Sequence, residues 1–131
     1  MNSIKKGNIT ELRVQLALVE KGYDVFTPIT DGSSVDLIFI NKENQAIKVQ
    51  VKKSSKTATG FSFEARKCTS SSRVRKNSYN IDEIDYFATY WKGKTYMIPL
   101  EETMERRNVC LRIKEDYKNQ NKPLLARHYS I

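Results

Sequence analysis

A carboxylate, an amide and a lysine stand within two neighbouring apolar segments of the sequence. Asp36 interrupts the run VDLIFI (35–40), and Gln50 and Lys52 belong to the run AIKVQVKKSS (46–55). Because both runs are rich in Val, Ile and Phe and the polar NKENQ separates them, they predict a β-hairpin that brings Gln50 and Lys52 beside Asp36. Side chains alternate along a strand, which puts Gln50 and Lys52 on one face. A carboxylate in so apolar a segment is costly to bury unless it is paired or binds a metal ion, so these residues form the candidate site.

A helix before this hairpin carries a second candidate carboxylate. Residues 7–21 predict a helix, because apolar residues recur at helical spacing and Gly22 follows the last of them. Asn8 or Thr10 is the expected cap, which places Glu11 in the first turn, where the helix dipole favours an anion. From position alone, dipole complementation is the simpler role for Glu11. The apolar stripe expected to face the core consists of Ile9, Leu12, Leu16 and Val19.

The acid on one strand and the Gln-x-Lys triplet on the next resemble the PD-(D/E)XK nuclease superfamily. Val35-Asp36 stands for the first half of that signature and Gln50-Val51-Lys52 for the second, with Gln50 replacing an acid. The segments GYDVFTPITDGSSVDLIF and IKVQVK are similar to the small intron-encoded homing endonucleases, in which the Gln-x-Lys variant also occurs. More distantly, the arrangement resembles the archaeal Holliday-junction resolvases. The resemblance covers about residues 5–100. It implies an α/β (α+β) restriction-endonuclease-like core, in which an N-terminal helix is followed by a mixed central β-sheet.

The resemblance also implies a role for each residue of the site. Asp36 is expected as the central ligand of Mg²⁺, for which Mn²⁺ would substitute. The Gln50 side-chain carbonyl and the Val51 backbone carbonyl are further oxygen ligands of the kind that Mg²⁺ accepts. Both groups of nucleases take a glutamate for the metal site from an N-terminal helix, which assigns Glu11 to that role in place of dipole complementation. Lys52 is expected to orient or deprotonate the attacking water.

Positive charge is concentrated around the candidate site. Residues 42–77 hold ten Lys or Arg against two Glu, so their net charge is +8, the same as that of the whole chain. Such a block favours a polyanionic partner, although a solvated lysine-rich surface is the alternative reading. Together with this charge, the resemblance to homing endonucleases implies double-stranded DNA as the partner. Its candidate contacts are Ser34, Lys53, Ser54, Lys56, Arg66, Lys67, Arg73, Arg75 and Lys76.

The 131 residues fit a single domain, with the remaining elements following the site. Residues 61–65 predict a strand, and residues 85–91 and 95–100 predict a hairpin whose aromatic side chains are expected in the core more than on DNA bases. A short helix after Pro99 and a strand over 109–114 complete the expected elements. The basic segment around 66–80 is expected as a loop or arm that orders on DNA, and residues 114–131 as a polar tail.

Composition narrows the location and the assembly of the protein. The start MNSIKKGN has no apolar signal segment, and no apolar run approaches the roughly 20 residues of a membrane span, so we expect a cytoplasmic protein without membrane contact. Cys68 and Cys110 have no metal-ligand spacing and are expected as free thiols. One active site cuts one strand, so double-strand cleavage by so small a chain most simply requires a homodimer or a homotetramer.

A metal-dependent, site-specific DNA endonuclease of the homing type is the function that these observations favour. A structure-specific nuclease similar to the Holliday-junction resolvases fits almost as well. A catalytically inactive DNA-binding module on the same fold is a third possibility, because Gln50 removes a charge from the metal site.

Overall fold

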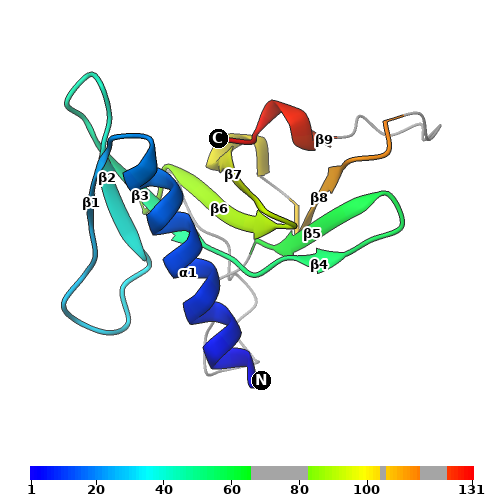
Figure 1. Ribbon diagram of the computed structural model, residues 1–131, viewed down its shortest axis with the longest axis horizontal. Coiled ribbons are helices and arrows are strands. Elements are labelled where there is room, and N and C mark those ends of the chain that lie inside the picture. The colour runs from blue at the N-terminus through cyan, green and yellow to red at the C-terminus, as the bar shows by residue number, and fades with distance from the viewer. Residues whose placement is uncertain (66–82, 104–105, 116–123) are drawn as a thin grey trace.

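The computed structural model describes residues 1–65, 83–103, 106–115 and 124–131. In this part of the chain, helix α1 (Ser3–Glu20) lies across one face of a five-stranded sheet, and a four-stranded sheet lies beyond it (Figure 1). The five-stranded sheet has the order β1 (Asp24–Phe26), β2 (Leu37–Ile40), β3 (Ala46–Val51), β6 (Tyr86–Trp91) and β7 (Lys94–Pro99). The other has the order β4 (Ser55–Lys56), β5 (Gly60–Glu64), β8 (Asn108–Arg112) and β9 (Leu124–Leu125). Two 3-10 helices cover Leu100–Thr103 and Ala126–His128.

The five-stranded sheet is mixed, as the sequence predicts. Strands β3 and β6 pair in parallel, whereas the other neighbours in this sheet are antiparallel. The predicted hairpin is β2 and β3, in which Leu37 faces Val49 and Ile40 faces Ala46. Its turn is held by Asn41, whose side-chain oxygen accepts hydrogen bonds from the backbone of Glu43 and Gln45. The expected N-terminal helix followed by a mixed central sheet is therefore confirmed.

Two apolar clusters hold the three layers together. Between α1 and the five-stranded sheet, Val14 and Leu18 pack with Leu37, Val49 and Val51. Between the two sheets, the cluster is built around aromatic rings. Its buried members are Phe61, Phe63, Ala65, Ile84, Phe87, Tyr96, Ile98, Leu100, Val109, Leu111 and Ala126. The aromatic residues of β6 and β7 thus serve mainly as core, in agreement with the sequence analysis.

Helix α1 differs from its prediction in two ways. It begins at Ser3, capped by the side chain of Asn2, so neither Asn8 nor Thr10 is the cap. Its buried row is Val14 and Leu18, with 0% and 1% exposure, so the expected core stripe was wrong. The exposed fractions of that stripe are 37% for Ile9, 63% for Leu12, 59% for Leu16 and 55% for Val19. The helix carries two apolar rows on different sides, and the longer one faces outward. Gly22, with φ 91°, ends the helix as expected.

The later elements agree with the prediction except near the C-terminus. The turn between β6 and β7 is formed by Lys92 and Gly93, which both have positive φ, as a two-residue hairpin loop requires. The expected short helix after Pro99 is the 3-10 helix Leu100–Thr103, and the expected strand is β8. Residues 124–131, expected within a polar tail, instead pair with the sheets: β9 runs parallel to β8, and the Ile131 backbone N–H donates to the Thr95 carbonyl.

Within the part of the chain that the structure describes, no helix has the length and apolar character that crossing a membrane requires. The basic arm expected around 66–80 lies wholly outside the described residues.

Packing of the second sheet requires a glycine at position 60. A Cβ atom on Gly60 would lie 2.1 Å from the Leu111 carbonyl oxygen. Gly60→Ala should therefore lower the free energy of unfolding by more than about 1 kcal/mol. The matched control is Gly7→Ala in α1, where a Cβ atom has no neighbour within 4 Å. It should raise the free energy of unfolding by about 0.5–1 kcal/mol, because alanine favours a helix interior. Urea melts of the two variants measure both values, and equal midpoints would contradict this packing.

Candidate active site

Asp36 lies immediately before β2, at the point where that strand meets β3. Its backbone N–H donates to the Val49 carbonyl at 2.9 Å, and its carboxylate oxygen Oδ2 accepts from the Val51 backbone N–H at 2.8 Å. Asp36 therefore binds the residues on both sides of Gln50. Sequence analysis placed Asp36 inside the strand, and the structure places it one residue outside. That position frees its side chain to bond along the edge of β3.

The electrostatic surroundings of Asp36 bring Glu11 and Lys52 into the same site. Burial raises the pKa of the half-buried Asp36 carboxyl above its ordinary value of 3.8, while the Val51 N–H and the nearby Lys52 ammonium act to lower it. Burial also raises the pKa of Glu11 above 4.5, and the neighbouring negative charge of Asp36 adds to this rise. Two carboxyl groups within electrostatic range of each other, both disfavoured as anions by burial, would be stabilised by a bound cation, because a cation compensates their negative charge.

Glu11 reaches this site from the middle of α1. It is the ninth of the helix's 18 residues, far from the first turn where the sequence analysis placed it. The helix dipole acts only at the ends, so dipole complementation does not explain this residue. Its position on the same side as Val14 and Leu18 directs it toward the sheet, where it comes within electrostatic range of Asp36. The structure thus brings Glu11 to the carboxylate that the sequence analysis paired with it.

Gln50 carries a buried polar atom with no partner among the described residues. Val49 and Val51 point toward α1, so strand alternation directs Gln50 and Lys52 to the opposite face of β3. The side-chain oxygen Oε1 of Gln50 is buried there and accepts no hydrogen bond from the part of the chain that the structure describes. A buried oxygen without a donor costs roughly 1–3 kcal/mol, so its retention requires an explanation.

The residues present fit a hard, oxygen-binding cation. The carboxylates of Asp36 and Glu11 and the orphaned Gln50 oxygen are donors of the type that Mg²⁺ prefers. The N–H and C=O of one strand residue point to the same side. Because the Val51 N–H meets Asp36, the Val51 carbonyl faces that side as well. Among the described residues, no three His, Cys, Asp or Glu side chains form a metal-binding group, so any metal here would depend on the amide and backbone oxygens.

The candidate DNA contacts occupy different positions around this site. Lys53 donates through Nζ to Ser3, which links the segment after β3 to the start of α1, and the Ser54 hydroxyl donates to the Tyr90 carbonyl. Lys56 is exposed on β4, and Ser34 is half-buried in the loop before Asp36. Four of the candidates therefore lie in the described part of the chain, and the side chains of Lys53 and Ser54 are hydrogen-bonded within the protein. The others, Arg66, Lys67, Arg73, Arg75 and Lys76, lie outside the described residues.

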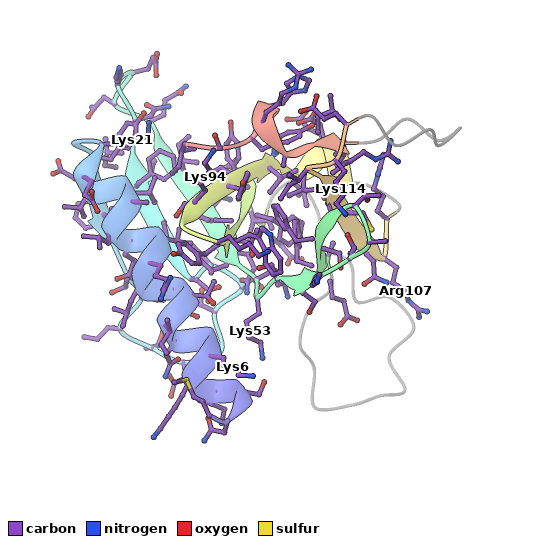
Figure 2. All side chains as sticks on the ribbon, turned by 45° about the vertical axis from the view of Figure 1, so that its right-hand side comes forward. Lys6, Lys21, Lys53, Lys94, Arg107 and Lys114 are labelled. Atoms are coloured by element: carbon purple, nitrogen blue, oxygen red, sulfur yellow. The ribbon has the colours of Figure 1, made fainter. Side chains whose placement is uncertain are left out.

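The sequence analysis missed a basic residue beside this region. Lys6 lies near Lys53 beside the N-terminal half of α1 (Figure 2). The pair Lys5-Lys6 was visible in the sequence, but a helix expected to begin at Gly7 left both lysines outside it. With the true start at Ser3, Lys6 becomes a helical residue on the site's flank.

Comparison with known proteins agrees with this arrangement. Residues 1–130 match the sequence profile of a protein family described as "PD-(D/E)XK endonuclease". The chain belongs to this family. Its fold is also similar to that of a bacterial homing endonuclease, I-Ssp6803I, with a TM-score of 0.77 and 26% sequence identity. That similarity covers 99% of this chain and 89% of the other. Among curated proteins no match was found.

These findings confirm the expected family, the restriction-endonuclease-like fold and a PD-(D/E)XK endonuclease that resembles a homing endonuclease.

The raised pKa values predict a pH dependence of stability. In the folded protein Glu11 holds its proton at pH values where the unfolded chain has lost it. The free energy of unfolding therefore falls as pH rises from the ordinary pKa of 4.5 through the higher folded value. Glu11→Gln removes this penalty. Without metal, its melting temperature should exceed that of the original protein at about pH 8 and equal it at about pH 4.

The matched control is Glu43→Gln, an exposed substitution in the β2–β3 turn. Relative to the original protein, its melting temperature should not rise with increasing pH. Thermal melts in a chelating buffer measure all three proteins. A Glu11→Gln variant that is less stable than the original at about pH 8 would show that the carboxylate is stabilised, contrary to its burial beside Asp36.

Proposed function

We propose that this PD-(D/E)XK endonuclease is a Mg²⁺-dependent DNA endonuclease that cuts both strands of a duplex as an assembly of two or four copies. The observation that carries the proposal is the buried, unpartnered Oε1 of Gln50 beside Asp36. In a DNA-binding module without catalysis, a buried oxygen that accepts no hydrogen bond would only destabilise the fold. A metal ligand, by contrast, must not be occupied by a hydrogen-bond donor. Mn²⁺ would satisfy the same oxygen ligands.

Each residue of the site has a distinct role in this proposal. Asp36 is held by the Val51 N–H through Oδ2, and the proposal assigns its other oxygen to the metal ion. Glu11 adds a second carboxylate from α1, which supports a further ion directly or through water. Mg²⁺ in this position supplies positive charge that neutralises the scissile phosphate. Lys52 stands within electrostatic range of Asp36, where its ammonium orients the attacking water.

The substrate assignment rests on charge and on the comparison. The net charge of the chain is +8, and in the described part of the chain Lys6 and Lys53 lie beside the N-terminal half of α1 (Figure 2), while Lys56 is exposed on β4. Phosphate neutralisation by such groups gives affinity that falls with salt. The similar protein I-Ssp6803I is a homing endonuclease, which favours a linear duplex over a four-way junction as substrate. A single site per chain then requires a second copy for the second strand.

Removing the reacting groups should abolish cleavage without abolishing binding. With Mg²⁺, Asp36→Ala and Lys52→Ala should each reduce duplex cleavage by at least about 10³-fold, because the transition-state charge loses its compensation. In Ca²⁺, DNA affinity should remain within a few fold, and Asp36→Ala removes a charge that repels phosphate. Lys42→Ala, at an exposed turn, is the control and should cut normally. Cleavage assays on supercoiled and linear DNA measure these effects.

Two results would reject the assignment. Retained cleavage by purified Asp36→Ala or Lys52→Ala would remove these residues from the reaction. A protein that binds duplex DNA yet shows no cleavage with Mg²⁺ or Mn²⁺ would be a binding module on the nuclease fold. Efficient cutting of a four-way junction with an intact linear duplex would instead identify a junction-resolving enzyme.

Substitutions at Gln50 distinguish a metal ligand from a residue that only packs against the strand. Gln50→Glu keeps the shape and adds a charge, so the Mg²⁺ concentration for half-maximal cleavage should fall while cleavage survives. Gln50→Ala deletes the oxygen and should reduce cleavage by roughly 10²-fold, the cost of losing one stabilising ligand. Titration of Mg²⁺ against cleavage rate measures the three proteins, and equal midpoints would exclude Gln50 from the site.

A further inference from the structure

The outward row of α1 is a continuous apolar surface on a helix that already has a buried side. Val14 and Leu18 fill the contact with the sheet, yet Ile9, Leu12, Leu16 and Val19 remain 37–63% exposed. In Figure 1, α1 lies in front of the five-stranded sheet, and no other described element covers its outer side. We define these four residues as the outer row. Apolar surface of this extent on one helix marks an interaction site more often than chance exposure.

The spacing of the outer row fits packing against another helix. Its members follow one another at intervals of three, four and three residues, and Lys5 continues the series toward the N-terminus. This alternation is the pattern of two helices that pack side by side with interlocking side chains. A helix of 18 residues is about 27 Å long, and the row covers most of that length. Neither a flat ligand nor a nucleic acid has rows of side chains that could pack between those of the outer row, so this spacing favours a helix as the partner.

Charges at the two ends of the row identify the partner as a second copy of this chain. Lys5 stands at the N-terminal end and Glu20 at the C-terminal end, and both are exposed. Two antiparallel copies, related by a two-fold axis near Leu12, place Ile9 opposite Leu16 and Lys5 opposite Glu20. Parallel copies would instead set Lys5 against Lys5. The row is therefore complementary to itself in one orientation, as a two-fold interface requires.

We infer that the outer row of α1 is the surface on which two copies of this protein associate, with their α1 helices antiparallel. The inference deepens the proposed function, since it rests on the need for two active sites and says how they are joined. Glu11 precedes Leu12 in the chain, so the two active sites flank the two-fold axis at the same level along the helices. One duplex can then meet both sites, one for each strand.

The first test is the mass of the protein without DNA or metal. Light scattering and sedimentation should give a dimer or a tetramer for the original chain. Leu16→Glu should halve the mass, or weaken the dimer by at least about tenfold, because a charge would be buried without a partner. Leu16 is 59% exposed, so circular dichroism should show an unchanged fold. The control is Ile29→Glu, another exposed apolar position that is 101% exposed and lies outside the row. It should keep the original mass.

A charge exchange tests the orientation without touching the apolar row. Lys5→Glu should weaken association several-fold, since it sets like charges against Glu20. Glu20→Lys added to it should restore association. A glutamate near the N-terminus and a lysine near the C-terminus both interact favourably with the helix dipole. A smaller molecular mass of these variants therefore cannot be caused by a destabilised helix. A rescue that fails, a Leu16→Glu variant of unchanged mass, or a monomeric original chain would each overturn the inference.

The same proteins separate this inference from the proposed function. If both are correct, monomeric Leu16→Glu should nick supercoiled DNA and lose double-strand cleavage. If the original chain is a dimer that Leu16→Glu splits, but neither protein cuts DNA with Mg²⁺ or Mn²⁺, the interface stands and the nuclease assignment fails. If cleavage of both strands survives in the monomer, the interface has no role in placing the two sites and the inference falls.

Discussion

The hydrogen bond from the Val51 N–H to the Asp36 carboxylate is the contact on which the site depends. Strand β2 begins at Leu37, and just before it the Asp36 backbone N–H donates to the Val49 carbonyl. Beyond Val49, the register of β2 with β3 places no β2 residue opposite Val51. The Asp36 side chain takes the position of the missing strand and satisfies the Val51 N–H. The same bond fixes a carboxylate within range of Glu11 and Lys52 and leaves the Val51 carbonyl facing the site. A strand that began one residue earlier would pair this edge with backbone and close the site.

The uncharged side chain of Gln50 lowers the electrostatic repulsion among the candidate site residues, but it leaves a buried oxygen without a hydrogen bond. Burial is the main cause of the raised pKa of both Glu11 and Asp36, and the negative charge of Asp36 adds to the rise at Glu11. A third carboxylate would increase that repulsion in the absence of a cation. An amide offers a similar oxygen without the charge, at the cost of an unsatisfied buried atom. In the proposed cation site, this exchange would weaken metal binding while lowering the repulsion between ligands, and DNA phosphates would then take a larger share in completing the coordination.

Much of this arrangement was predictable because its signals are local. Alternating Val, Ile and Phe define β2 and β3, and the Lys92-Gly93 turn defines the second hairpin. The start of α1 was missed because Gly7 disfavours a helix interior and looked like a boundary. The pairing of residues 124–131 with the sheets was missed because it depends on distant partners. Likewise, nothing local shows that the Gln50 oxygen is buried without a donor, since that depends on the packing of both sheets.

The error over α1 has a structural cause that also explains its use. The helix carries one row through Val14 and Leu18 and another through Leu12 and Leu16, and periodicity alone cannot say which faces the sheet. The four-residue row looked like the core, but the narrow contact with the sheet needs only two large side chains. Glu11 lies on the side of that inner row, so the helix must keep its inner face toward Asp36. The second row is then directed outward, so the helix that brings Glu11 to Asp36 also carries the surface on which we infer that another copy packs.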